Sequence, residues 1–367
     1  MIAYELALEK VKNGAKPEVV AAELVDSMTL EEKIHCLDGA VPFWVGIKDI
    51  TTGGYHSRPF RAAKVERLGI PGFHFSDGPR GVVVGEATAF PVSMARGATF
   101  DPELETRVGD ATGKELRTIG ADLYGGICVN LLRHPAWGRA QETYGEDPHH
   151  VGEMGAGLTR GAQRHVMATL KHFALNSMEN ARFGVDVTVD ERTLHEVYLP
   201  HFKRIVDEGV ACVMTAYNSV NGQWCSQSEE LLAEILRSEW GFTGFVISDW
   251  IFGVRDGVKS LQAGLDVEMP YRMIRNAPIV AALAEGLIIE ELVASAVTRT
   301  IATMLKFNVG KLPVHDRSVV LCKEHLMLSQ EVAEKSMVLL KNESVGSTAL
   351  LPLELKSGLK IAMFGRL

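Results

Sequence analysis

The stretch Gly244-Phe245-Val246-Ile247-Ser248-Asp249-Trp250 decides the fold class of this chain. Its first four residues are apolar and too few to make a helix, so they predict a short buried strand. A helical stretch at 229–239 and a turn at 240–244 come directly before it. Helix, turn and apolar strand in this order are typical of a parallel sheet. An acid at the carboxyl end of such a strand, here Asp249, lies where α/β barrels hold their functional groups.

The same pattern recurs along much of the 367-residue chain. Short apolar segments predict strands at 72–75, 126–130, 166–170, 210–215, 244–248 and 264–267. Helical stretches separate the later strands, at 149–165, 191–208, 229–239 and 254–263. Repeated βα units imply a parallel sheet covered by helices, and so many units favour a TIM-type (β/α)8-like barrel over an open sheet. A capping box at Thr29 with Glu32, and Pro102 after Asp101, mark two further helix starts.

The composition changes after residue 308 and suggests three segments. Residues 1–310 are predicted to form the barrel domain, and 311–335 a linker with a helix at 323–334. Residues 336–367 hold apolar runs and a predicted strand at 360–364. Because a parallel strand needs neighbours that are reached by crossovers, we expect 336–367 to begin a C-terminal α/β sandwich domain whose remainder is absent.

The charge balance disfavours two classes of partner. With 38 basic and 46 acidic residues the net charge is −8, which argues against nucleic acid and anionic membrane surfaces. No apolar run reaches the ~20 residues that cross a bilayer, and the charged start has no signal-peptide core. The 5 cysteines form no CxxC pair, which favours reduced thiols in a cytoplasmic protein. No residue pattern indicates a metal or a cofactor.

Polar side chains follow five of the predicted strands. They are Asp77, Arg133, Lys171-His172, Tyr217-Asn218 and Asp249-Trp250. This mixture of carboxylates, cations, an imidazole and aromatic rings suits a sugar, because sugar hydroxyls prefer charged partners and sugar C–H faces stack on rings. The sequence therefore predicts a carbohydrate site at one edge of the sheet.

Each of these residues also has a purely structural interpretation. Asp77 and Asp249 could complete turns, Lys171 could be a solvated charge, and His172 and Trp250 could belong to the core. A shared site is favoured because five successive strand ends would otherwise have to carry such residues by chance.

From residue 28 to 367 the chain resembles the glycoside hydrolase family 3 enzymes, such as β-glucosidases. The matching motifs follow one another along the chain: Ser76-Asp77-Gly78-Pro79; Asn130 to Arg133, then Trp137-Gly138-Arg139 and Glu142; Lys171-His172-Phe173 with Asn176, Glu179 and Arg182; Glu191-Arg192-Thr193-Leu194; Met214 with Ala216-Tyr217-Asn218; and Ser248-Asp249-Trp250. So many motifs in order make the resemblance specific.

The resemblance implies a retaining, exo-acting β-glycoside hydrolase that takes a small carbohydrate, with β-glucosides ahead of β-xylosides. Asp249 would be the nucleophile that forms a covalent glycosyl-enzyme, and nearby cations would lower its pKa. The innermost sugar would be bound by Asp77, Arg133, Lys171, His172, Tyr217 and Trp250.

Two departures from the family stand out. A retaining enzyme needs a second carboxyl group about 5–5.5 Å from the nucleophile, as acid and then base. In β-glucosidase-like members this is a glutamate of the second domain, and we expect it to lie in the absent C-terminal part.

The β-N-acetylglucosaminidase branch takes a histidine from the loop after Lys-His-Phe, but 174–177 reads Ala-Leu-Asn-Ser, which disfavours that branch. Val83 stands where the family often has arginine.

Two other functions stay open at this point. A truncated chain could be a non-catalytic or weakly active sugar-binding relic. Lys171 could instead form the Schiff base of an aldolase, because barrel enzymes of that class carry a lysine at a strand end. A homo-oligomer is compatible with the sequence.

Overall fold

A computed structural model of the chain describes residues 3–308, 316–346 and 348–365. It divides into two compact units, 1–336 and 337–367. The predicted domain boundary between 310 and 311 lies outside the described residues. No helix in the described ranges is long and apolar enough to span a membrane.

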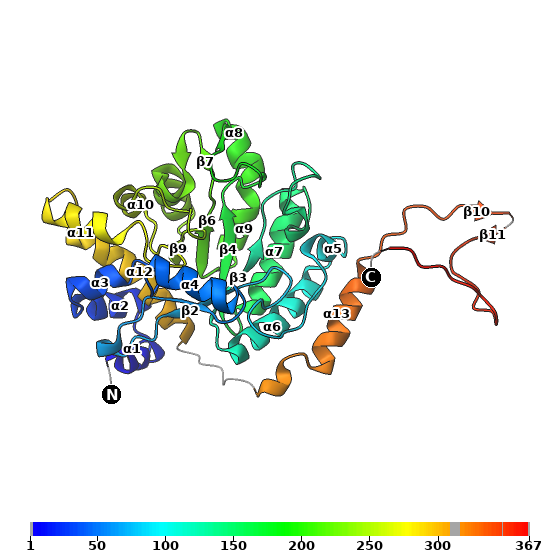
Figure 1. Ribbon diagram of the computed structural model, residues 1–367, viewed down its shortest axis with the longest axis horizontal. Coiled ribbons are helices and arrows are strands. Elements are labelled where there is room, and N and C mark those ends of the chain that lie inside the picture. Colours follow the sequence, from blue (N-terminus) through cyan, green and yellow to red (C-terminus); the bar gives the residue numbers. More distant parts are fainter. Residues whose placement is uncertain (1–2, 309–315, 347, 366–367) are drawn as a thin grey trace. The chain divides into compact units, whose positions relative to one another are not determined.

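A six-stranded sheet forms the centre of the first unit, in the order β1-β2-β3-β4-β6-β9 (Figure 1). Each neighbouring pair from β2 to β9 is parallel. The strands are β1 (Phe60–Ala62), β2 (Phe73–Asp77), β3 (Leu123–Cys128), β4 (Met167–Phe173), β6 (Cys212–Thr215) and β9 (Phe245–Ile247).

The two edges of this sheet are linked by single β-bridges. One bridge joins β9 to Val267, the next joins Glu268 to Asp38, and the third joins Gly39 to β1. The strand predicted at 264–267 is therefore present only as a bridged residue. The first unit is a mixed α/β fold with a curled, barrel-like sheet.

The first strand differs from the parallel arrangement that the sequence predicted. β1 was not predicted, and it runs antiparallel to β2. The connection 63–72 between the two strands holds only the short helix η1 (Glu66–Leu68). A parallel pair needs a crossover of a dozen or more residues, so this connection is too short for one.

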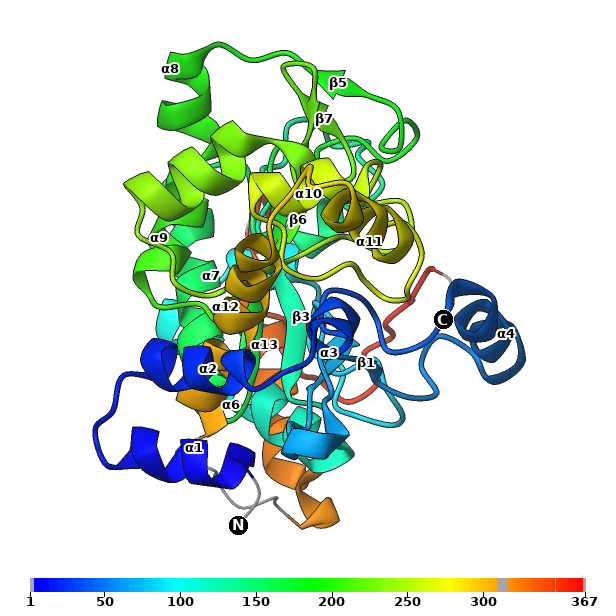
Figure 2. The same cartoon turned by 90° about the vertical axis from the view of Figure 1, so that its left-hand side faces the viewer.

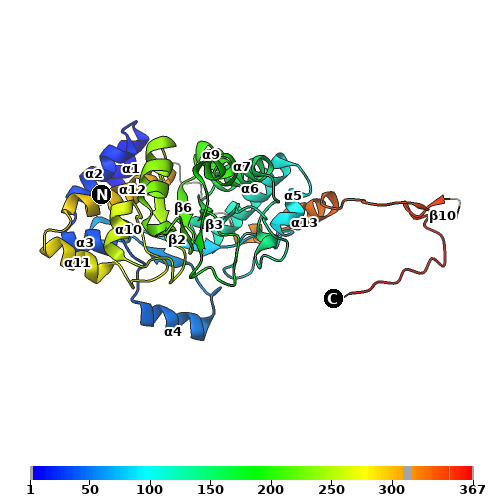
Figure 3. The ribbon, with the colours of Figure 1, turned by 90° about the horizontal axis from the view of Figure 1, so that it is seen from above.

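Helices cover the sheet on both sides. In Figures 2 and 3, α6, α7 and α9 lie side by side along one side of the strands, and α4 projects away on the other. α12 packs on α2 and β9. The α-helices of this region are α1 (Ala3–Lys12), α2 (Pro17–Asp26), α3 (Leu30–His35), α4 (Phe43–Gly53), α5 (Ser93–Gly97), α6 (Pro102–Ile119), α7 (Pro148–Ala162), α8 (Glu191–Thr193), α9 (Pro200–Asp207), α10 (Gly257–Ala263), α11 (Asn276–Ala284) and α12 (Glu290–Asn308).

The predicted helix starts are confirmed by their capping contacts. Thr29 and Glu32 form the capping box of α3, and Asp101 accepts a hydrogen bond from the Leu104 amide at the start of α6. The predicted helix at 191–208 consists of α8, a π-helical turn η3 (Leu194–Tyr198) and α9, and the one at 229–239 is the π-helix η5 (Glu230–Glu239).

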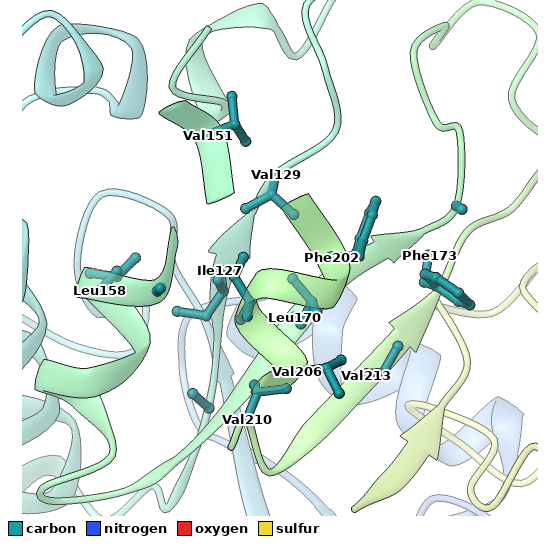
Figure 4. Close-up of a cluster of buried hydrophobic side chains, with 14 of the residues drawn as sticks. Ile127, Val129, Val151, Leu158, Leu170, Phe173, Phe202, Val206, Val210 and Val213 are labelled. Carbon is teal, nitrogen blue, oxygen red and sulfur yellow. The ribbon is translucent and has the colours of Figure 1, made fainter. Parts of the chain in front are cut away.

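Alternate residues of the strands belong to two different hydrophobic cores. Val213 of β6 packs with α7 and α9 in the core drawn in Figure 4, whereas its neighbours Cys212 and Met214 belong to the core inside the curled sheet. Successive strand residues point to opposite faces, so a strand covered on both faces must be apolar throughout. This is why the strands appear in the sequence as short continuous apolar runs.

The segment after the undescribed residues 309–315 packs against α6. It contains η6 (Arg317–Val319) and the predicted helix α13 (Lys323–Lys335). The buried carboxylate of Glu115 in α6 lies 2.7 Å from Nδ1 of His325 and accepts a hydrogen bond from the Leu321 amide. These contacts join α13 to the first unit.

The second unit has little regular structure in its described residues. A hairpin of β10 (Ser344–Val345) and β11 (Thr348–Ala349) is present, whereas the predicted strand at 360–364 is not formed. Leu340 and Phe364 are almost fully exposed. A strand is stable only when a neighbouring strand satisfies its backbone groups, and the described residues of the unit provide no such neighbour for 360–364.

Candidate active site

Residues from the carboxyl ends of four parallel strands meet at one cavity of about 330 Å³. β2 supplies Asp77, β4 supplies Lys171 and His172, and Tyr217 and Asp249 follow β6 and β9. The lining residues are Tyr55, Asp77, Pro79, Val83, Arg139, Glu142, Lys171, His172, Arg182, Met214, Tyr217, Asp249 and Trp250. Of the predicted site residues, all but Arg133 line this cavity.

The carboxylate of Asp249 is buried and only partly satisfied by the protein. Oδ1 accepts a hydrogen bond of 2.8 Å from the Trp250 amide, whereas Oδ2 accepts none of good geometry from the described residues, although the nearby Tyr217 hydroxyl lowers the pKa of the carboxyl group. Oδ2 lies 3.8 Å from Nε2 of His172. A buried polar atom without a partner is rare in folded proteins and needs an explanation.

Burial raises the pKa of Asp249 to about 6. Arg139, the Trp250 amide and Lys171 lower it, but desolvation outweighs them. This differs from the prediction made from the sequence, in which the nearby cations lower the pKa of Asp249. At pH 7 a carboxyl group with this pKa is still mostly ionised, so the side chain remains a nucleophile or base.

The loop after β9 fixes the direction of this carboxylate. Ile251 has a φ of 62°, an unusual conformation for a β-branched residue. A side chain on Gly253 would meet the Asp249 carbonyl oxygen at 2.3 Å, so only glycine fits there. The hydroxyl of Tyr217 donates to the Trp250 carbonyl across 2.8 Å. Strained backbone of this kind persists where the surrounding contacts hold it.

The buried Lys171 and the partly buried Asp77 form an ion pair in the cavity. Nζ of Lys171 lies 2.5 Å from Oδ1 of Asp77, and the hydroxyl of Tyr55 donates to Oδ2. Although burial alone would raise it, Lys171 holds the pKa of Asp77 below its ordinary value. Asp77 likewise outweighs burial and raises the pKa of Lys171. Both groups are charged at neutral pH.

His172 is neutral and has a defined tautomer. Burial lowers its pKa well below the ordinary value, and Arg139 and Lys171 act in the same direction. Nε2 lies 2.9 Å from a guanidinium N–H of Arg139 and must accept, because arginine only donates. The proton is therefore on Nδ1, which lies 3.1 Å from Oδ1 of Asn130.

The structure does not bring Arg133 to the cavity. Its side chain is exposed, with the guanidinium 5.6 Å from the ring centre of Tyr198. Arg139 lines the cavity instead and pairs with Glu142 across 2.6 Å. The buried Trp137, whose indole N–H donates to Glu179, holds the turn that directs the later arginine inward. The motif Trp137-Gly138-Arg139 was part of the resemblance, so the sequence carried this signal without a role being assigned to it.

Tyr55 and Arg182 also line the cavity and were not predicted as site residues. Tyr55 follows α4, in a region with no recognised strand or motif. Arg182 belonged to one of the matching motifs without a role being assigned to it, and it forms an ion pair with Glu179 at 2.9 Å. Trp250 packs against Phe60 and Phe75, so its ring forms a rigid wall.

A second cavity of about 520 Å³ shares Tyr55 with the first. Its walls are mainly apolar, and Asp49, its one lining carboxylate, is paired with Arg58. Within the described ranges, no cluster of three or more His, Cys, Asp or Glu side chains is arranged to hold a metal ion. Of these two cavities the first therefore holds more carboxylates, namely Asp77, Glu142 and Asp249.

Comparisons of the sequence with a family model and with individual proteins point to the same family. Residues 6–303 match the family described as the glycosyl hydrolase family 3 N-terminal domain. A β-glucosidase of Rhizobium radiobacter is 37% identical over 357 residues, which are 94% of this chain and 40% of that protein. Thermostable β-glucosidase B of Acetivibrio thermocellus is 37% identical over 361 residues, 94% of this chain and 44% of that protein.

A solved structure shows the same similarity in three dimensions. β-Glucosidase 3B of Thermotoga neapolitana, in complex with glucose, superposes with a TM-score of 0.80 at 34% identity, over 91% of this chain and 48% of that one. The chain thus spans less than half the length of each of these relatives.

Proposed function

Because the chain belongs to glycosyl hydrolase family 3, we propose that it cleaves β-glucosides by a retaining mechanism in which Asp249 is the nucleophile. The observation that carries this proposal is the buried Oδ2 atom of Asp249, which accepts no hydrogen bond of good geometry from the described residues. The anomeric carbon of a sugar would be its partner. The names of the relatives, β-glucosidases, support the choice of sugar.

The proposed reaction has two steps. In the first, Oδ2 of Asp249 bonds to the anomeric carbon, the glycosidic C–O bond breaks, and its electron pair leaves with the aglycone oxygen, which takes up a proton. In the second, water attacks the same carbon and gives up a proton to the general base, the bond between this carbon and Oδ2 breaks, and the carboxylate is restored. Positive charge from Arg139 and Lys171 helps to keep the carboxylate ionised before the attack.

The general acid and base is proposed to come from outside the described residues, from the second domain that the resemblance implies. The cavity has two other carboxylates, and neither suits the role. Lys171 holds the pKa of Asp77 low against burial, and Arg139 does the same for Glu142. A general acid at neutral pH needs a raised pKa instead.

The innermost sugar is proposed to bind between the ion pair and the indole. Asp77 and Lys171 present an acceptor and a donor, and the neutral His172 lies beside Asp249. Arg139 takes the place that the sequence analysis gave to Arg133. Trp250 offers an apolar wall for the C–H face of the ring.

Two other functions, an aldolase and a non-catalytic sugar-binding protein, have less support than the proposed glycosidase. An aldolase would need Lys171 as a free amine, whereas its raised pKa and its contact with Asp77 favour the protonated form; borohydride trapping of an imine with a keto substrate would support that function. A non-catalytic sugar-binding protein is compatible with a cavity in which no described carboxyl group suits the role of general acid. Glucose binding without any turnover of activated glucosides would favour it.

We also propose that the first unit is a variant of the TIM-type (β/α)8 barrel. The six strands and the two bridged segments, 38–39 and 267–268, together give the eight positions of such a ring. A crystal structure in which the two edges of the sheet are not hydrogen-bonded to these segments would contradict this proposal.

The stereochemical course tests the proposed function. Proton NMR during hydrolysis of 4-nitrophenyl β-glucoside is expected to show the β-anomer of glucose first, followed by slow mutarotation. The α-anomer as first product would mean direct attack by water and would exclude a glycosyl-enzyme on Asp249.

A further inference from the structure

The second cavity, of about 520 Å³, takes no part in the proposed reaction. Most of its wall comes from residues 40–41, from α4, from the loop 54–59, from β1 and from residues 270–271. Apart from Tyr55, its lining residues differ from those of the first cavity. Cavities of about 300–1,000 Å³ with mainly apolar walls and a few polar groups are typical of sites for small molecules.

Three aromatic rings form one wall of this second cavity. The ring centroids of Tyr55 and Phe60 are 5.3 Å apart, and those of Phe60 and Tyr271 are 6.1 Å apart. The hydroxyl of Tyr271 donates to the Gly46 carbonyl across 2.9 Å, and a side chain on Gly46 would collide with the Tyr271 ring, so α4 packs directly on it. Because contacts within the protein hold the rings, a flat aromatic ligand would stack on them at little cost in conformational entropy.

Cationic side chains outnumber carboxylates around the same cavity. Arg58, Arg61 and Lys64 line it, whereas Asp49 is the one carboxylate among its described lining residues. Asp49 is paired with Arg58, and Lys64 is paired with Glu66, which does not line the cavity. Arg61 forms no ion pair with the described residues, so its guanidinium is left to bind an anion.

The rings and the cations together define the chemistry of a ligand. A sugar would find no free carboxylate acceptor here, because Asp49 is already paired. A cationic ligand would be repelled by the excess of positive charge, and a neutral apolar one would leave the Arg61 guanidinium without a partner. We propose that the second cavity binds an aromatic carboxylate, whose ring stacks on the aromatic wall and whose carboxylate pairs with Arg61. This inference goes beyond the proposed function and does not rest on it.

The test compares two probes that share their rings and differ in charge. Isothermal titration of the 367-residue chain with 2-naphthoate and with the neutral 2-naphthamide, both at neutral pH, gives the two affinities. We expect the acid to bind at least about tenfold more tightly, because a charge-assisted hydrogen bond to arginine is stronger than a neutral one. Arg61→Gln should lower the affinity for the acid about tenfold and change that for the amide less than about twofold. Ile50→Trp, which places a larger side chain in the cavity from α4, should lower both affinities at least about tenfold.

Two matched variants of α4 separate the cavity from general effects. Lys48→Gln removes a cation and Val45→Trp adds an indole on the same helix, but neither residue lines the cavity, so both variants should keep the wild-type affinity for the acid.

Three results would overturn the proposal: no binding of the acid to the wild type, equal affinities for the acid and the amide, or an unchanged affinity for the acid in Arg61→Gln. Undiminished binding of the acid to Ile50→Trp would place it in another site and would overturn the proposal as well. Circular dichroism verifies that each variant is folded. If Ile50→Trp does not fold, Arg61→Gln decides alone, because this exposed side chain can be changed without disturbing the core.

Discussion

A guanidinium N–H of Arg139 donates to Nε2 of His172 across 2.9 Å, and this contact fixes the protonation state of the imidazole. The proton on Nδ1 is in turn directed at Oδ1 of Asn130, which also accepts from the His172 amide. Arg139 therefore acts on the proposed sugar site in two ways, as a positive charge near Asp249 and as the donor that fixes the tautomer of His172, which burial keeps neutral.

Replacing Arg139 should harm activity far more than replacing Arg133. Arg139→Lys keeps the charge but loses the planar donor fork, so we expect kcat/KM for 4-nitrophenyl β-glucoside to fall at least about tenfold, as hydrogen bonds to charged groups contribute about 1.5–3 kcal/mol. Arg133→Lys is the matched control and should change kcat/KM less than about twofold. If Arg133→Lys lowered kcat/KM more than Arg139→Lys did, Arg133 and not Arg139 would be the sugar-binding arginine, as the sequence predicted.

The rate of glycosyl-enzyme formation should depend on pH through Asp249. Only the ionised carboxylate attacks, and burial places its pKa at about 6. We expect kcat/KM for 2,4-dinitrophenyl β-glucoside, which needs little protonation of its leaving group, to fall tenfold per pH unit below this value. Circular dichroism at each pH serves to exclude unfolding. A flat profile down to pH 4.5 would disagree with a buried carboxylate as nucleophile.

The same carboxylate should reduce the stability of the fold. Its folded pKa, about 6, lies above the ordinary value of 3.8, so the folded state binds this proton more tightly than the unfolded state. The resulting loss of unfolding free energy is absent below pH 3.8, the ordinary pKa. It grows as the pH rises from 3.8 to about 6, the folded pKa, and it is complete above that pH. Asp249→Asn should therefore raise the unfolding free energy by up to about 3 kcal/mol at pH 7.5.

The gain from Asp249→Asn should disappear near pH 4, where the wild-type carboxyl group is protonated in the folded state. Urea unfolding of both proteins at several pH values measures this difference. A constant difference across the range would mean that the substitution acts through packing and not through the charge.

The Lys171–Asp77 pair should show strong coupling. Lys171→Met leaves a largely buried carboxylate without its cation, and we expect a loss of about 3 kcal/mol in unfolding free energy. In Lys171→Met/Asp77→Asn no unpaired charge remains, and most of this loss should be recovered. Additive effects in the double-mutant cycle would show that the two side chains do not interact in solution.

Much of the sheet could be predicted because its strands are buried on both faces. Residues such as Val213 and Met214 are apolar whichever core they enter, so each strand forms a short apolar run. The residue after each run then lies at the carboxyl edge by necessity, which is why Asp77, Lys171 and Asp249 were found from spacing alone.

The remaining site residues lie on irregular loops, where the spacing of residues does not predict which way a side chain points. Arg133 and Arg139 are separated by a turn whose course depends on the contact of Trp137 with Glu179, distant in sequence. Tyr55 reaches the cavity from the loop after α4, and Arg182 from the long loop after β4. The antiparallel β1 was missed for a similar reason, because a three-residue strand has too few residues to show a period.

The most direct test of the account is the location of the covalent intermediate. Incubation with 2,4-dinitrophenyl 2-deoxy-2-fluoro-β-D-glucoside, followed by peptide mapping with mass spectrometry, identifies the residue that carries the sugar. The account predicts one fluoroglucosyl adduct per chain, on Asp249, and none in Asp249→Asn. An adduct on Glu142 or Asp77, or continued turnover of activated glucosides with no adduct at all, would contradict it.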